Sequence, residues 1–173
     1  MNRKRNFRKY FLGVMLSSIF ILLFLSGVEA GQKLTVSGIG WIQPVNSSNL
    51  ISGAGSDLIS TYQSAVNATI LTISKCNSNH ERWRVEVSRT DSFWDNVNLV
   101  ISVLRTSDGV YAPGATISGG TSPVEVGASP KTFFSGSGDH SNITIQYQLS
   151  GMSVKTNPGL YCSAVTFTLV DIP

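Results

Sequence analysis

The chain has 173 residues, with 13 Lys and Arg against 10 Asp and Glu and a formal net charge of +3. Five of the basic residues and one acidic residue lie in the first 30 positions, so the remaining 143 residues carry a net charge of −1. Binding to a nucleic-acid backbone requires clustered positive charge, and this balance therefore excludes a nucleic-acid-binding domain. A segment of 143 residues suits a single domain.

The first 30 residues have the three parts of a secretory signal peptide. A basic segment at 3–9 precedes an apolar run at 10–25 and a small-residue ending at 26–30. We expect cleavage between Ala30 and Gly31, which leaves a secreted domain in the periplasm, on the cell surface or outside the cell. The alternative is an uncleaved membrane anchor. The apolar run has 16 residues, short of the roughly 20 needed to span a bilayer.

Residues 31–173 have the composition and periodicity of an all-β domain. Apolar residues never recur at helical spacing over three turns, and turn residues separate short runs every eight to fifteen positions. This pattern predicts a single antiparallel Greek-key β-sandwich of the immunoglobulin-like kind with about eight or nine strands. The irregular loop lengths favour a sandwich over an up-and-down barrel.

Four strands are expected in the first half of the domain. They span residues 33–42, 57–63, 68–76 and 82–88. The first is predicted to be an edge strand, because glycines loosen it and Pro44 ends it. Segment 57–63 also fits one capped helical turn, and we favour the strand. In the fourth, Trp83 alternates with charged neighbours and is expected to face the core.

The second half contains the two clearest alternations of the sequence. The strands expected there span residues 97–105, 131–134, 141–149 and 161–170, with short edge strands between 110 and 130. The predicted centre of one core consists of Ile143, Ile145, Tyr147, Val165, Phe167, Leu169, Trp83, Val85, Leu99 and Ile101.

Groups suited to catalysis are scarce. The two histidines, His80 and His140, lie in turn-like polar surroundings. The run Gly-Asp-His-Ser at 138–141 suggests a catalytic relay, but neighbours in sequence point in different directions, and relays are assembled from distant segments. We interpret both histidines as ordinary loop residues and predict that the protein is not an enzyme. A small hydrolase using Asp139 and His140 is the third functional hypothesis.

Metal ligands are also few. Asp91 with Asp95, or Asp57 with Asp139, offer carboxylate oxygens to a calcium ion, but no run matches a full calcium loop. We interpret these residues as solvated turn aspartates. No metal and no cofactor are expected.

The two cysteines, Cys76 and Cys162, are predicted to form a disulfide in an oxidising compartment. Both fall outside the core register, one at the end of its strand and the other at the start. We therefore expect 68–76 and 161–170 to be adjacent antiparallel strands of one sheet, joined near a common end.

Four aromatic residues have no place in the predicted core: Trp94, Phe93, Trp41 and Tyr111. Phe93 and Trp94 are expected in a polar turn at 91–96. Such rings either form a satellite cluster beneath loops or stack against sugars or a partner subunit. Trp94 is the preferred candidate for ligand binding.

The C-terminal segment 157–169, Asn-Pro-Gly-Leu-Tyr-Cys-Ser-Ala-Val-Thr-Phe-Thr-Leu, resembles the final strand of secreted bacterial immunoglobulin-like domains. Spore coat protein U-like and fimbrial-subunit-like domains share this ending. The resemblance implies a secreted, non-catalytic surface subunit, which a strand donated by a neighbour can complete.

Two main functional hypotheses follow. The first is an extracellular structural or adhesive β-sandwich that associates with itself or with cell-surface proteins. The second is a carbohydrate-binding module that binds glycans through Trp94, Phe93 or Trp41. An uncleaved signal segment would be the means of membrane attachment.

Overall fold

The structure is a computed structural model that describes residues 31–38, 40–94 and 98–173. Within these residues the chain forms β-strands and one short 3-10 turn, Ser47–Asn49, without an α-helix. Accordingly, the described part of the chain holds no helix long and apolar enough to cross a membrane. The predicted signal segment, 1–30, lies outside the described residues.

Eleven strands are present in the described residues. They are β1 (Lys33–Gly38), β2 (Thr61–Gln63), β3 (Thr69–Ser74), β4 (Arg82–Phe93), β5 (Val100–Arg105), β6 (Val110–Tyr111), β7 (Thr116–Gly119), β8 (Val124–Glu125), β9 (Lys131–Ser137), β10 (His140–Ser150) and β11 (Cys162–Ile172).

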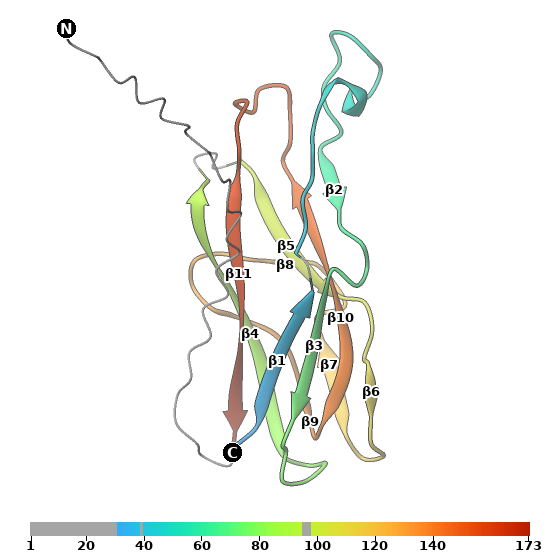
Figure 1. Cartoon of the computed structure of the whole chain (residues 1–173), viewed down its shortest axis with the longest axis vertical. Coiled ribbons are helices and arrows are strands. Elements are labelled where there is room, and N and C mark those ends of the chain that lie inside the picture. The colour runs from blue at the N-terminus through green and yellow to red at the C-terminus, as the bar shows by residue number, and fades with distance from the viewer. Residues whose placement is uncertain (1–30, 39, 95–97) are drawn as a thin grey trace, which may run out of the picture.

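The strands form two antiparallel sheets, which confirms the all-β prediction (Figure 1). One sheet has the order β1-β3-β10-β5-β8, and β2 and β6 also pair with β10. The other has the order β11-β4-β9-β7. We call them the β10 sheet and the β4 sheet. The predicted edge position of the first strand is confirmed, since β1 ends the β10 sheet.

The structure has more strands than the eight or nine predicted, because the region between 110 and 130 contains three short strands, β6, β7 and β8. On each side of β10 the neighbouring strand is interrupted. β2 and β3 pair with opposite ends of β10, and the chain leaves the sheet between them. β5 and β6 likewise pair with two different parts of β10. Each pair therefore supplies separate segments antiparallel to β10.

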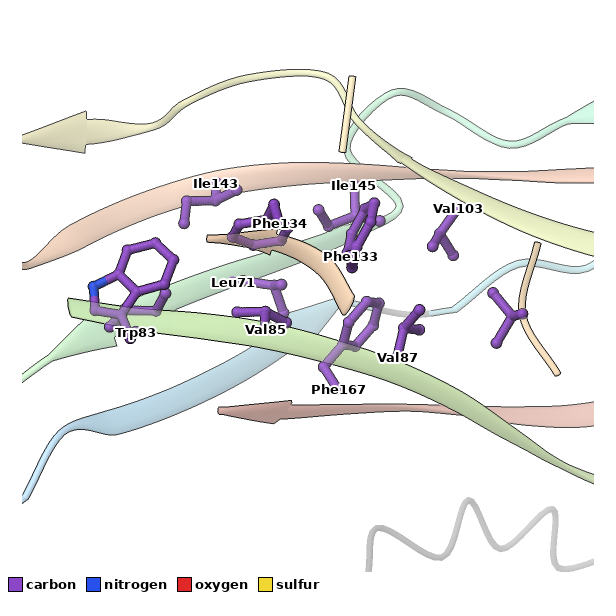
Figure 2. Close-up of a cluster of buried hydrophobic side chains, with 12 residues drawn as sticks. Leu71, Trp83, Val85, Val87, Val103, Phe133, Phe134, Ile143, Ile145 and Phe167 are labelled. Carbon is purple, nitrogen blue, oxygen red and sulfur yellow. The ribbon is translucent and has the colours of Figure 1, made fainter. Parts of the chain in front are cut away.

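The main core fills the space between the two sheets (Figure 2). Its buried residues are Leu71, Ile73, Trp83, Val85, Val87, Val103, Val126, Phe133, Phe134, Ile143, Ile145 and Phe167. Of the other predicted core residues, four are partly buried at its margin: Tyr147, Val165, Leu169 and Ile101.

A second, smaller core cluster contains Tyr62, Leu99, Leu149 and Met152. The expectation of one core is therefore corrected, because Leu99 belongs to this cluster and not to the main one. Trp41, Trp94 and Tyr161 pack against its margin.

A β-bulge in β9 changes which side chains face the core. Val85 pairs with Phe134 but Glu86 pairs with Thr132, so Phe133 is an extra residue in β9. As a result, the consecutive residues Phe133 and Phe134 are both buried in the main core. The strand predicted at 131–134 also continues through Gly136 to Ser137.

The predicted disulfide and its strand pairing are both wrong. β3 belongs to the β10 sheet and β11 to the β4 sheet, where it pairs with β4. Cys76 follows β3 near the end of β11, since Lys33 of β1 pairs with Ser74 and the preceding Gln32 donates a hydrogen bond to Asp171. Cys162 begins β11, nine residues before Asp171, which is roughly 30 Å along a strand. Both thiols are free. The wrong pairing arose because a period-two pattern indicates which face of a sheet a residue is on, but not which strand lies beside it.

Candidate functional site

A pocket of about 480 Å³ lies where β4 ends and β11 begins. It is lined by the strand end 91–94 and by the loop 157–161, and we call it the aromatic pocket. Two predicted site residues, Phe93 and Trp94, are part of its wall. Phe93 is the last residue of β4, so the expected polar turn begins later than the sequence suggested.

A bulge in β4 shapes this pocket. Cys162 pairs with Phe93 while the next residue, Ser163, pairs with Asp91, so Ser92 is an extra residue in β4. Such a bulge breaks the alternation of the strand and changes the direction of the residues that follow it. Phe93 therefore does not follow the alternation that places the core residues earlier in β4 on the inner face.

The two neighbouring aromatic residues play different parts. The Phe93 side chain is 64% exposed. Trp94 is partly buried: its Nε1 donates a hydrogen bond to Leu99 O at 3.3 Å, and its ring meets Tyr161 edge-on at 5.8 Å. The Arg89 guanidinium lies over the Trp94 ring, 4.9 Å from its centroid. Phe93 thus presents the accessible ring, and Trp94 supports the wall.

Trp41 does not lie among the residues that line the aromatic pocket. It is partly buried and packs against the second core cluster, as does Trp94. Trp41 therefore packs in a satellite cluster, which was the first of the two interpretations of these aromatic residues.

Polar groups hold the aromatic pocket in shape. The Tyr161 hydroxyl donates a hydrogen bond to Asn157 O at 2.7 Å, which fixes the loop. The Asp91 carboxylate lies 3.5 Å from the Arg89 Nε and forms an ion pair with it. Asp91 and Asn157 both line the pocket, so an amphipathic ligand meets an aromatic ring and oxygen atoms together.

The second candidate surface is the open edge, which we define as the outer edges of β1 and β11. In the part of the chain that the structure describes, β11 pairs with β4 and β1 pairs with β3, and neither strand has a partner on its other side. The two strands lie side by side at one end (Figure 1), where Gln32 Nε2 donates a hydrogen bond to Asp171 Oδ1 at 3.5 Å.

Apolar side chains that face the core are left partly uncovered along the open edge. Val36 pairs with the fully buried Leu71 and so shares its face, yet Val36 is 50% exposed. On β11, Val165 and Leu169 pack against the main core but are only partly buried. The sandwich is therefore incompletely covered on this side.

His140 is a buried core residue, and its interpretation as a loop residue is wrong. It begins β10 and is 1% exposed. His140 pairs with Ile73 and Ile143 with Leu71, which leaves one extra residue in β10 at the position of Asn142, whose φ is 60°. Asparagine tolerates this left-handed conformation, and the bulge turns His140 inward.

The run at 138–141 does not form a catalytic relay in the described structure. His140 Nε2 lies 3.1 Å from Thr116 O and 3.2 Å from Ser137 O, and its Nδ1 lies 3.4 Å from Asp108 O. The Asp139 carboxylate instead accepts a hydrogen bond from Cys76 N at 2.9 Å. Burial lowers the pKa of His140. The imidazole is thus held by backbone carbonyls.

Asp57 and Asp139, one predicted pair of calcium ligands, accept hydrogen bonds from different parts of the chain. Asp57 accepts hydrogen bonds from Val154 N and Leu58 N, which lower the pKa of its carboxyl, and Asp95 lies outside the described residues. His80 is exposed and lines a separate hollow of about 400 Å³ near Arg82. The described residues contain no group of three or more His, Cys, Asp or Glu placed to hold a metal ion.

Comparisons with protein-family models, with curated proteins and with solved structures find no match for this chain. The functional argument therefore rests on the aromatic pocket and the open edge.

Proposed function

We propose that the protein is a secreted, non-catalytic structural subunit of the cell surface that assembles through its open edge. The observation that carries this proposal is the exposure of apolar side chains facing the core on both β1 and β11, above all Val36. An unpaired strand edge is a template for another strand, and an apolar strip beside it adds an energetic gain.

The geometry favours one direction for an added strand. β1 begins where β11 ends, so the two run in opposite directions (Figure 1). A strand that pairs with β11 and approaches β1 is antiparallel to one and parallel to the other. The edge of β11 is the longer, with eleven residues against six, and antiparallel pairing is the more stable per residue. We therefore propose that the partner strand runs antiparallel to β11.

Two further points support the proposal. The resemblance of 157–169 to the last strand of spore coat protein U-like and fimbrial-subunit-like domains suits a Greek-key, immunoglobulin-like sandwich that accepts a strand. The three-part leader suits secretion after cleavage near Ala30 and Gly31, which the assembly of a surface subunit requires.

Substitution of residues at the open edge tests the proposal. Val36→Lys and Val165→Lys place a charge among the uncovered apolar side chains, whereas Thr35→Lys and Thr166→Lys place the same charge on the opposite faces of the same strands. In sedimentation velocity over a wide concentration range, we expect the purified protein to form oligomers. The first two variants should be monomeric, and the two controls should assemble normally.

Binding to cell-surface material provides the second measurement, since the neighbour that supplies the strand can be another surface protein. A protein that stays monomeric at every concentration and also fails to bind isolated cell-surface proteins would refute the proposal. Equal loss of assembly in the Val36→Lys and Thr35→Lys variants would show that the apolar strip plays no part.

A further inference from the structure

The aromatic pocket lies apart from the point where β1 and β11 come together. It adjoins Cys162, the first residue of β11, whereas β1 approaches Asp171 near the other end of that strand. The pocket is therefore a second surface with its own chemistry, and the inference drawn from it does not depend on assembly through the open edge.

Phe93 provides an open apolar ring at this pocket. Its side chain is 64% exposed although it ends a strand whose earlier residues Trp83, Val85 and Val87 are buried. The backbone of Phe93 is already ordered by pairing with Cys162, and a phenylalanine side chain has only two rotatable torsions, so a ligand that binds against it costs little conformational entropy. Trp94 and Tyr161 form a supported wall beside it through their edge-on contact at 5.8 Å.

The polar lining narrows the class of ligand. Asp91 is the only carboxylate among the described residues that line the pocket, and Asn157 and Ser92 are uncharged. A carboxylate accepts hydrogen bonds from hydroxyl groups and repels anions. The described residues that line the pocket include no Lys or Arg, and the nearby Arg89 is already paired with Asp91 and lies over the Trp94 ring. These groups favour a neutral ligand rich in hydroxyls.

We propose that the aromatic pocket binds a neutral saccharide, with the apolar face of one pyranose ring stacked on Phe93. The ring hydroxyls at the sugar's edge donate hydrogen bonds to the Asp91 carboxylate and pair with Asn157. A volume of about 480 Å³ accommodates a short oligosaccharide segment. This combination of an aromatic face and rim oxygens matches a pyranose, which has C–H groups on its faces and hydroxyls around its perimeter.

The test is an array of neutral oligosaccharides beside sialylated and uronic-acid-containing ones, probed with the full chain and followed by titration calorimetry on the best neutral ligand. Phe93→Ala and Phe93→Leu both remove the aromatic face, while Phe93→Trp enlarges it. Leu160→Ala is the matched control, because Leu160 is also exposed (73%) in the pocket but has no aromatic face.

We expect binding to neutral glycans, a loss of about tenfold in affinity for Phe93→Ala and Phe93→Leu, and affinity equal to or above that of the wild type for Phe93→Trp. Leu160→Ala should change affinity by less than about threefold. Asp91→Asn should weaken binding and leave the circular dichroism spectrum unchanged.

Three outcomes would overturn the inference. The first is no binding to any neutral glycan on the array. The second is a preference for acidic glycans. The third is unchanged affinity in Phe93→Leu, which would mark the pocket as an apolar contact for a protein chain.

Discussion

The edge of the Trp83 ring packs against the His140 imidazole, with the ring centroids 5.4 Å apart and the planes at 85°. Tyr111 covers the imidazole from another side, at 4.8 Å. Trp83 Nε1 donates a hydrogen bond to Gly138 O at 2.8 Å, just before His140 in the chain. The two residues thus join the turn between β9 and β10 to the main core, and His140 has a structural role.

The stability of the protein should fall in mild acid because of His140. Burial lowers its pKa in the folded state, and the charge of Arg105 lowers it further, against the opposing effects of backbone carbonyls and Asp139. An unfolded histidine has a pKa near 6.5. The unfolded chain therefore takes up a proton first, so the contribution of His140 is complete above about pH 6.5 and is lost as pH falls toward the folded pKa.

Urea unfolding between pH 7.5 and pH 5.5 measures this effect. We expect the free energy of unfolding to decrease by up to about 1.4 kcal/mol per pH unit in this range. The slope should be flatter in His140→Gln. His80→Asn is the control, because His80 is exposed, and it should keep the wild-type slope. A wild-type slope in His140→Gln would contradict the assignment.

Gly136 should not tolerate a side chain. A Cβ atom there would lie 2.3 Å from Thr116 O and 2.6 Å from the Trp83 ring, and both neighbours belong to the packed sandwich. We expect Gly136→Ala to lower the free energy of unfolding by about 1–3 kcal/mol or more. Gly127→Ala is the matched control, since nothing lies within 4 Å of its Cβ position. Similar denaturation midpoints for the two variants would show that the β7–β9 packing is wrong.

Truncation of a core residue should lower the free energy of unfolding in either sheet. Ile145 is 0% exposed in the β10 sheet and Phe167 is 9% exposed in the β4 sheet. We expect Ile145→Ala and Phe167→Ala each to cost about 2–5 kcal/mol in denaturant unfolding. Thr166→Ala, on the outer face of β11, should cost about 0.5 kcal/mol or less. Losses below about 1 kcal/mol at both core positions would contradict the register.

The two thiols should differ in reactivity. Burial first, and then the Asp139 carboxylate, raise the pKa of Cys76 to about 12, so little reactive thiolate is present near neutral pH. Cys162 is exposed. With iodoacetamide at pH 8 and peptide mass spectrometry, we expect Cys162 to be alkylated in the folded protein and Cys76 only after unfolding. A peptide pair linked by a Cys76–Cys162 disulfide within one chain would refute this.

The sequence by itself determined the fold class and most core faces. In β11, the alternation of Val165, Phe167 and Leu169 with threonines predicted the inward face, and the structure places these three against the main core. In β4, the same reasoning placed Trp83 and Val85 correctly. Period-two patterns carry this information because successive strand residues point to opposite faces, and burial of one face selects the apolar set.

The tertiary structure determined features that the alternation of apolar and polar residues along a strand does not encode. Bulges at Phe133 and Asn142 each add one residue, and so they buried two successive phenylalanines and turned His140 inward. Phe93 is exposed because the end of β4, residues 90–93, is exposed on both faces. Each bulge depends on pairing with a strand distant in sequence, which no local pattern records.

The choice of strand neighbours was likewise settled only in three dimensions. The cysteines share a strand-end position in the sequence, but β3 pairs with β10 and β11 with β4, so the cysteines adjoin strands of different sheets and lie near opposite ends of β11. Backbone hydrogen bonds are the same for every strand pair. The neighbour of each strand is therefore selected by how the two whole faces of the sandwich pack together. The same packing left apolar residues of β1 and β11 uncovered and placed Phe93 at an open pocket.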